Sequence, residues 1–342
     1  MSKKTVNILK YLFFLTLAVA LMYFAFKSVN FDDFIAGLQE VNYWLVALSI
    51  IIGIAGYVFR VLRWKILIDS LGYNISPKNV YNAIMIGYLA NFTIPRIGEI
   101  IRCSVLKKTD KIDFEKTLGT VIVERCYDVI FLFLFLIFVI AIKFNVFGTF
   151  VSEKIYQPLL AKIDAIPVFL IVSAIVVTAV ILLFVFYIRK RISKIIKGLI
   201  SGLKTGIVMK NRKKFLFYTI LIYLCYWLTG FLVLKSLPAT SSLNAMDALF
   251  LFVVGAFGWV IPAQGGFGSY HILVALGLGV YKISYKDGII VATIAHESQV
   301  VFMILLGFVS LVMFLIFCRK MRKTDANILQ ENEKDIYKSL TK

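Results

Sequence analysis

The chain is poor in acidic residues, cysteine and histidine. Its 342 residues include 19 Asp and Glu against 38 Lys and Arg, with four Cys and two His. The cysteines are widely scattered and form no Cys-x-x-Cys pair, so the sequence supports neither a disulfide framework nor a zinc site. Only two histidines could add further metal ligands, so we expect no metal centre. No motif in the sequence indicates a cofactor.

Motifs of catalysis are missing as well. The chain has no Ser-His-Asp set, no P-loop and no glycine-rich dinucleotide motif. Its acids do not form an exposed pair for general acid–base work. We therefore predict no catalytic residues and do not expect an enzyme.

Apolar sequence, in contrast, is abundant. Hydrophobic residues make up 60% of the chain and charged residues 17%, a composition that predicts an integral membrane protein. Each long apolar run approaches the roughly 20 residues that a helix needs to cross the hydrocarbon. The runs occupy residues 8–26, 43–59, 118–142, 167–188, 215–236 and 288–318. We interpret the first run as an uncleaved span and not as a signal peptide, because it continues past the candidate cleavage site.

Lysine and arginine are distributed unevenly around these runs. Six crossings place both termini on one side, and most cations fall on that side, before the first run and within 60–116, 189–214 and 319–342. Because Lys and Arg concentrate on the cytoplasmic side, we predict a cell inner-membrane protein with cytoplasmic termini. Topology then accounts for the positive charge, and no nucleic-acid partner is expected. The acid-free loop 189–214 is typical of a solvated loop, with docking of anionic headgroups as the alternative.

Two further apolar segments, 79–108 and 247–281, are interrupted near their middles by proline and glycine. Both contain the pattern Ile-Pro-x-x-Gly. Irregular backbone is tolerated in hydrocarbon only where protein or a water-filled cavity surrounds it. The two breaks therefore predict an internal cavity. Whether these segments are re-entrant hairpins or pairs of thin spans stays open.

The organisation repeats along the chain. Two spans, a broken hairpin and a third span occupy residues 1–142, and the same order recurs in 167–318 after an external loop at 143–166. Because the first half starts inside and the second outside, the halves are predicted to be inverted copies, as in many secondary transporters. The predicted fold is an all-α polytopic membrane protein with six full transmembrane helices and two re-entrant or broken hairpins in an inverted-topology repeat. A cytoplasmic tail follows at 319–342.

The first broken hairpin carries candidate anion-binding residues. Pro95 ends one half-helix, and the free amides at the start of the next form a partial positive pole. Arg96 and Arg102 add full positive charge, a combination suited to phosphate. Glu99 either takes part in the site or caps the helix and pairs with Arg102 at i, i+3.

The third span opens with three charges, Glu124, Arg125 and Asp128, which are costly inside a membrane. The two acids share a helix face at i, i+4 and require a cation between or opposite them. Arg125, Arg96 and Arg102 are the candidates. The alternative is an ion-pair network that locks the hairpin to this span and has no role in transport.

The second broken hairpin contains a glycine-rich turn whose backbone amides can approach a ligand closely. The candidate residues in this turn are Gln264, Gly265 and Gly266. Glycine-rich turns are common, so this pattern has low specificity.

The last span carries a second group of candidates, His296 and Glu297, near mid-depth. As a pair they predict a proton-linked switch. The alternative is a histidine that is hydrogen-bonded to a neighbour. His271 has no comparable support in the sequence.

Three motifs in order carry a resemblance to a known family. They are Ile94-Pro95-Arg96-Ile97-Gly98-Glu99-Ile100-Ile101-Arg102, Glu124-Arg125-Cys126-Tyr127-Asp128 and Pro262-Ala263-Gln264-Gly265-Gly266-Phe267-Gly268. From the first to the last span, the chain resembles the lysylphosphatidylglycerol synthetase transmembrane-region family of flippase-like membrane proteins. In that family the membrane region resembles a lipid translocator, sometimes fused to a soluble synthase domain.

The resemblance implies substrate-binding roles for residues of the first two motifs, which are Arg96, Glu99, Arg102, Glu124, Arg125 and Asp128. Two positions depart from the family pattern. His271 stands where the family usually has an acid, and His296-Glu297 where an arginine is common. Since this chain stops shortly after the last span, we expect no synthase domain.

We therefore expect a translocase for an anionic or phosphate-linked lipid, such as a phospholipid or a polyprenyl-phosphate-linked substrate. Two alternatives stay open. One is a membrane enzyme acting on lipid-linked glycans or aminoacyl-lipids. The other is an accessory subunit that recruits a separately encoded synthase or glycosyltransferase through the loop 189–214. A homodimer is also left open.

Overall fold

The computed structural model describes residues 3–158, 160, 209, 211–261 and 263–340, and in these ranges every regular element is helical. The elements are α1 (Lys3–Phe26), α2 (Phe31–Gln39), α3 (Tyr43–Asp69), α4 (Pro77–Asn91), α5 (Gly98–Asp110), α6 (Phe114–Ile142), α7 (Phe144–Thr149), the π-helix η1 (Phe150–Tyr156), α11 (Arg212–Ser236), η2 (Pro238–Thr240), α12 (Ala245–Val260), η3 (Gln264–Gly266), α13 (Ser269–Leu278), η4 (Gly279–Tyr281) and α14 (Tyr285–Leu340). The predicted span 167–188 and most of the basic loop 189–214 lie outside the described residues.

Four described helices are long and apolar enough to cross a membrane: α3, α6, α11 and the part of α14 up to Met321. The apolar part of α1 qualifies as a fifth only together with α2, from which it is bent by 82°. The described residues thus supply four or five of the six predicted crossings.

Helix α3 is longer than the predicted span 43–59, because it continues to Asp69. The Asn42 side chain caps its start by accepting a hydrogen bond from the Trp44 amide. Beyond residue 59 the apolar pattern goes on, and Val61, Trp64 and Leu67 are buried. Arg60 and Arg63, which neighbour these residues, are therefore carried inside the helical bundle and not into a loop.

Helices α3 and α11 form the central antiparallel pair. The Asn42 amide, before α3, donates to the Ser236 carbonyl at the end of α11 over 2.8 Å. Further along, the ring centroids of Phe59 and Tyr218 lie 6.2 Å apart. The start of α11 therefore lies at the same end of the molecule as the end of α3.

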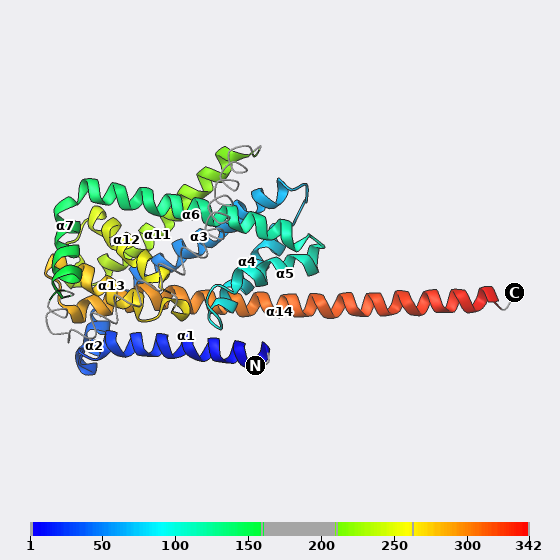
Figure 1. The fold of residues 1–342 in the computed structure, drawn as a ribbon, viewed down its shortest axis with the longest axis horizontal. Helices are drawn as coiled ribbons and strands as arrows, with labels where there is room; N and C mark the ends of the chain where they lie inside the picture. Colours follow the sequence, from blue (N-terminus) through cyan, green and yellow to red (C-terminus); the bar gives the residue numbers. More distant parts are fainter. Residues whose placement is uncertain (1–2, 159, 161–208, 210, 262, 341–342) are drawn as a thin grey trace, which may run out of the picture.

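The chain is interrupted at both places where proline and glycine predict a break. Helices α4 and α5 are separated by residues 92–97, and α12 and α13 by residues 261–268. At 1.5 Å per residue none of these four helices reaches the roughly 30 Å of a bilayer core. Figure 1 shows α4 and α5 toward the end from which α14 projects, and α12 and α13 toward the opposite end, with α2 and α7.

The segments predicted as an external loop and a cytoplasmic tail are helical where they are described. The described start of 143–166 forms α7 and η1, and the tail from residue 319 continues α14 without a break to Leu340. Figure 1 also shows that the N-terminus of α1 and the C-terminal end of α14 point to the same side of the bundle.

Candidate functional site

The two breaks touch each other. The Gln264 side-chain amide donates a hydrogen bond of 3.0 Å to the Thr93 carbonyl. The rings of Phe92 and Phe267 lie 6.5 Å apart. Gly265 has a φ of 58°, and an added Cβ there would come within 2.7 Å of the Phe92 ring. Glycine is therefore required at this crossing both for its backbone conformation and for the close approach.

Arg96 belongs to this crossing and not to a cluster of charges. It has a φ of 65°, which is uncommon for a residue with a side chain. Its guanidinium is exposed and donates to the Val260 carbonyl over 3.4 Å. Of the three candidate cations for the two acids of the third span, Arg96 is therefore the one that does not contact them.

The start of α5 is only partly the free positive pole that was predicted. The Gly98 amide donates to the Asn91 side-chain oxygen over 2.7 Å, so one of the first amides of the helix is already bonded. The i, i+3 pair between Glu99 and Arg102 is absent. Glu99 has one buried carboxylate oxygen that lacks a hydrogen-bond partner.

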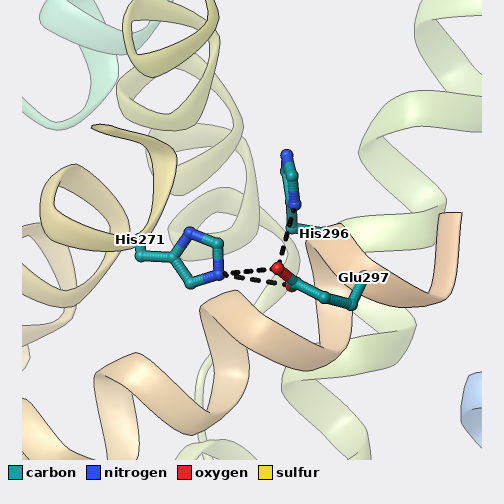
Figure 2. A group of neighbouring side chains, drawn as sticks. All are labelled: His271, His296 and Glu297. Carbon is teal, nitrogen blue, oxygen red and sulfur yellow. Dashed lines mark hydrogen bonds and ion pairs between the residues drawn. The ribbon is translucent and has the colours of Figure 1, made fainter. Parts of the chain in front are cut away.

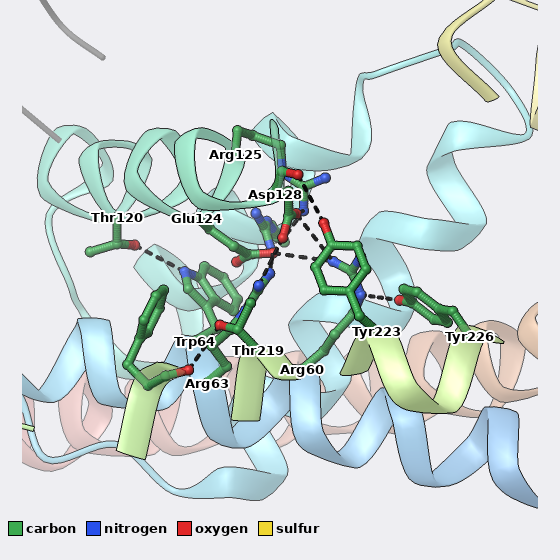
Figure 3. Close-up of polar contacts among 12 residues, drawn as sticks. Arg60, Arg63, Trp64, Thr120, Glu124, Arg125, Asp128, Thr219, Tyr223 and Tyr226 are labelled. Atoms are coloured by element: carbon green, nitrogen blue, oxygen red, sulfur yellow. Dashed lines mark hydrogen bonds and ion pairs between the residues drawn. The ribbon is translucent and has the colours of Figure 1, made fainter. Parts of the chain in front are cut away.

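Four arginines and two acids form what we call the arginine–acid cluster, which consists of Arg60, Arg63, Arg102, Glu124, Arg125 and Asp128. Glu124 lies at its centre, with carboxylate-to-guanidinium distances of 3.3, 3.1, 3.2 and 2.7 Å to the four arginines in chain order. Asp128 is 2.7 Å from Arg63 and 3.3 Å from Arg125. Figure 3 shows Arg60 and Arg63 extending from α3 toward the two acids on α6.

The cluster lies deep in the bundle. Helix α6 starts at Phe114, four residues before the predicted span, so Glu124 is about 15 Å along it. Arg60 is about 14 Å from the end of α3 at Asp69. Both positions are well inside their helices, and the side chains of Arg63 and Glu124 are 0% and 2% exposed.

The charges in the cluster do not balance. Arginine stays protonated in proteins, so four guanidinium groups face two carboxylates and leave an excess of two positive charges. Buried nitrogen atoms also lack hydrogen-bond acceptors, among them Nε of Arg63, Nε and Nη2 of Arg102 and Nε of Arg125. The Glu124 side chain is 2% exposed, whereas that of Arg125 is 42% exposed. The cluster can therefore accept an anion that approaches past Arg125.

Aromatic and hydroxyl groups hold the cluster in place. Arg60 donates from Nε to the Tyr226 hydroxyl, and the Tyr223 hydroxyl donates to the Asp128 carbonyl over 2.9 Å. The Arg102 guanidinium lies 4.4 Å from the ring centroid of Trp64. Since both tyrosines are on α11, the second half of the chain completes a site whose charges all come from the first half.

A second group of titratable side chains lies beside the second break. We call His271, His296 and Glu297 the histidine–glutamate cluster (Figure 2). The Glu297 carboxylate is 3.2 Å from His271 Nε2 and 3.3 Å from His296 Nδ1. His296 Nε2 lies 2.8 Å from the Gly265 carbonyl. Both imidazoles are buried, and Glu297 is 31% exposed.

An apolar groove of about 560 Å³ borders the crossing of the two breaks. Its walls are residues of α1 between Leu15 and Phe26, together with Phe92 and Phe267. Gln264, which bonds one break to the other, also lines it. The groove thus places apolar surface next to a polar junction.

The structure separates the predicted site residues into groups. Arg102, Glu124, Arg125 and Asp128 meet in the arginine–acid cluster, whereas Gln264, Gly265, Gly266, His296 and Glu297 gather at the second break. Arg96 lies at the crossing of the breaks through its bond to the Val260 carbonyl, and Glu99 joins neither cluster.

Sequence reasoning missed Arg60, Arg63 and His271. A signal for the first two is present, because they share one face at i, i+3 of a helix whose apolar pattern continues past them. For His271 we find no such signal, since it meets Glu297 only through the packing of α13 on α14.

Comparison with known proteins gives two matches. The family described as "Lysylphosphatidylglycerol synthase TM region" matches residues 7–307. Over 299 residues the chain is 24% identical to a UPF0104 membrane protein of Methanocaldococcus jannaschii, and the alignment covers 83% of this chain and 88% of that protein. No solved structure matches the chain.

Proposed function

The chain belongs to the lysylphosphatidylglycerol synthase transmembrane-region family, and from this premise we propose that it is a flippase-like translocase for an anionic or phosphate-linked lipid. The observation that carries the proposal is the excess of guanidinium groups over carboxylates in the arginine–acid cluster. A phosphate group would be the preferred ligand, because arginine binds phosphate oxygens in a bidentate geometry. Glu124 and Asp128 would offset the positive charge while the site is empty.

The finer topology is part of this proposal. The α3–α11 pair is antiparallel, α4 packs against α14, and α12 packs against α6. These relations are those expected of two inverted halves. Residue Lys154 of η1 lies beside Gly279, whereas Arg212 begins α11 at the opposite end of the molecule. Together with the span 167–188 predicted from the sequence, which lies outside the described residues, the chain would form two inverted halves with both termini on the cytoplasmic side of an inner membrane.

The apolar groove suits the other part of a lipid. Its walls are aliphatic and aromatic, and it ends at the polar junction formed by Gln264 and Thr93. We propose that acyl or prenyl chains lie along α1 while the headgroup reaches the interior. Movement of one half against the other would then expose the headgroup to each side in turn.

The test is lipid movement in proteoliposomes that contain phosphatidylglycerol with a fluorescent acyl chain. Access of a membrane-impermeant quencher reports the transfer between leaflets. Replacing Arg125→Gln should slow transfer about tenfold to a hundredfold, because a hydrogen bond to a charged group contributes roughly 1.5–3 kcal/mol. The matched control is Arg319→Gln, which removes an exposed arginine near the end of the apolar part of α14.

Transfer at the wild-type rate in correctly folded Arg125→Gln and Arg102→Gln would overturn the phosphate-binding role of the cluster. Wild-type protein that moves no lipid but copurifies with a synthase or glycosyltransferase would instead support the accessory-subunit hypothesis.

A further inference from the structure

We propose that His271, His296 and Glu297 form a binding site for a divalent transition-metal ion, with Zn²⁺ as the ion that fits best. The three side chains offer two nitrogen atoms and one carboxylate oxygen, and their ligand atoms lie within 4.8 Å of one another. Two histidines and one glutamate are an established ligand set for zinc sites that keep a fourth position open. This site is independent of the lipid-binding role proposed above.

The distances match the edges of a zinc coordination sphere. Zinc binds imidazole nitrogen and carboxylate oxygen at about 2.0–2.2 Å, so ligand atoms in a tetrahedron are about 3.3–3.6 Å apart. Here Glu297 Oε1 is 3.2 Å from His271 Nε2 and 3.3 Å from His296 Nδ1. These are two of the three edges, and all ligand atoms lie within 4.8 Å of one another, so the two imidazole nitrogens would approach each other by no more than about 1.5 Å when the ion binds.

The contacts of His296 indicate a cation between its Nδ1 and the Glu297 carboxylate. Its Nε2 faces the Gly265 carbonyl at 2.8 Å, and a carbonyl only accepts, so Nε2 carries the proton. In the neutral ring Nδ1 then has a lone pair, which points toward the Glu297 carboxylate and has no hydrogen-bond partner. Two acceptors in contact repel unless a cation lies between them. A metal ligand that donates its other ring N–H to a backbone carbonyl is the usual arrangement at metal sites.

The surroundings favour a stable and accessible site. His271 and His296 are fully buried, and the rings of Trp259, Phe267 and Tyr270 lie 5.0–5.3 Å from the His296 ring. Glu297 keeps 31% of its side chain exposed, which provides a path for the ion. A bound ion would join α13 to α14 and, through Gly265, would hold the second break in position.

The experiment measures zinc binding by the full-length protein, purified through a tag without histidine and stripped with EDTA. After dialysis against Zn²⁺, mass spectrometry of the metal should find one ion per chain, and competition with a chromophoric chelator gives the affinity. We expect Glu297→Gln and His296→Gln to lower this affinity more than about tenfold. Loss of a residue that only supports a metal ligand already lowers metal affinity by about tenfold to a hundredfold, and these two residues are ligands themselves. Glu115→Gln, which alters an exposed acid outside the cluster, should bind zinc like the wild type.

Two further measurements do not depend on the variants. Zn²⁺ should raise the midpoint of thermal unfolding of the wild type, because a ligand that binds only the folded state stabilises it. Co²⁺ should produce the visible absorption of a tetrahedral nitrogen and oxygen site. Wild-type protein that binds no Zn²⁺ at micromolar concentration, or variants that bind it as tightly as the wild type, would overturn the site. The cation between His296 and Glu297 would then be a proton.

Discussion

Glu124 is the residue on which the arginine–acid cluster depends, because its carboxylate contacts all four arginines within 3.3 Å. Taking charges out of water is costly, and their mutual attraction repays that cost only while each charge keeps a partner. The second acid, Asp128, approaches Arg102 in none of the described ion pairs. Without Glu124, the guanidinium of Arg102 would have no ion-pair partner among the described residues and would keep its contact with the Trp64 ring.

Glu124→Ala should therefore destabilise the protein by about 3–5 kcal/mol, the usual cost of leaving a buried charge uncompensated. The measurement is the midpoint of thermal unfolding in detergent, followed by tryptophan fluorescence. Glu115→Ala is the matched control, since Glu115 is on the same helix, near the start of α6, and is exposed. Equal midpoints for the two variants would show that the cluster does not stabilise the fold.

At the scale of elements, the α4–α5 hairpin closes through glycine. An added Cβ at Gly98 would overlap the Gly87 carbonyl oxygen and would lie 2.7 Å from the Asn91 side-chain oxygen. The same Asn91 oxygen accepts the Gly98 amide, so the turn is held by a hydrogen bond and by close packing together. Because Arg102 is one turn further along α5, this contact also sets the position of Arg102 in the cluster.

Gly98→Ala should force α4 and α5 apart, lower the unfolding midpoint and slow lipid transfer. Gly119→Ala is the control, because a Cβ at Gly119 on α6 would meet no atom within 4 Å. That change should be neutral or stabilise α6 by up to about 1 kcal/mol, as alanine favours helix. Both properties are measured on the same preparations, by thermal unfolding and by the proteoliposome assay. A Gly98→Ala protein with wild-type stability and transfer would contradict the role of this contact.

For the whole molecule, the central relation is that two broken hairpins meet from opposite ends of the bundle. The Gln264 to Thr93 hydrogen bond joins their tips, and α4–α5 and α12–α13 extend away from this junction in opposite directions (Figure 1). If both hairpins are re-entrant, their outer ends lie on opposite sides of the membrane. The junction would then be the narrow place that a headgroup passes.

Cysteine labelling tests this arrangement. In a background without the four native cysteines, Lys108→Cys near the end of α5 and Ser242→Cys before α12 introduce exposed thiols at the outer ends of the two hairpins. A membrane-impermeant maleimide should label residue 108 only in inverted vesicles and residue 242 only in right-side-out vesicles. The cysteine-free parent is the control. Labelling of both thiols from the same side would rule out opposed hairpins.

Several features of this protein were determined by the sequence alone, because they arise from local chemistry. A 60% apolar composition requires a membrane, and helices follow because a backbone in lipid must satisfy its own hydrogen bonds. The segment 92–97, which contains Pro95, separates α4 from α5, and the glycine-rich turn after residue 261 separates α12 from α13. Glu124 and Asp128 were predicted to need cations, since like charges at i, i+4 repel.

Only the tertiary structure decided which groups satisfy those needs. Two of the three candidate cations, Arg102 and Arg125, contact the acids, and the third, Arg96, lies at the junction of the breaks. Arg60 and Arg63 add two more cations from a helix about 60 residues earlier in the chain. His271 likewise reaches Glu297 across two packed helices. Periodicity and turn chemistry describe neighbours along the chain, whereas these contacts depend on how separate helices rotate and pack against each other. The physical reason is that helix packing, and not local sequence, determines which side chain pairs with each buried charge.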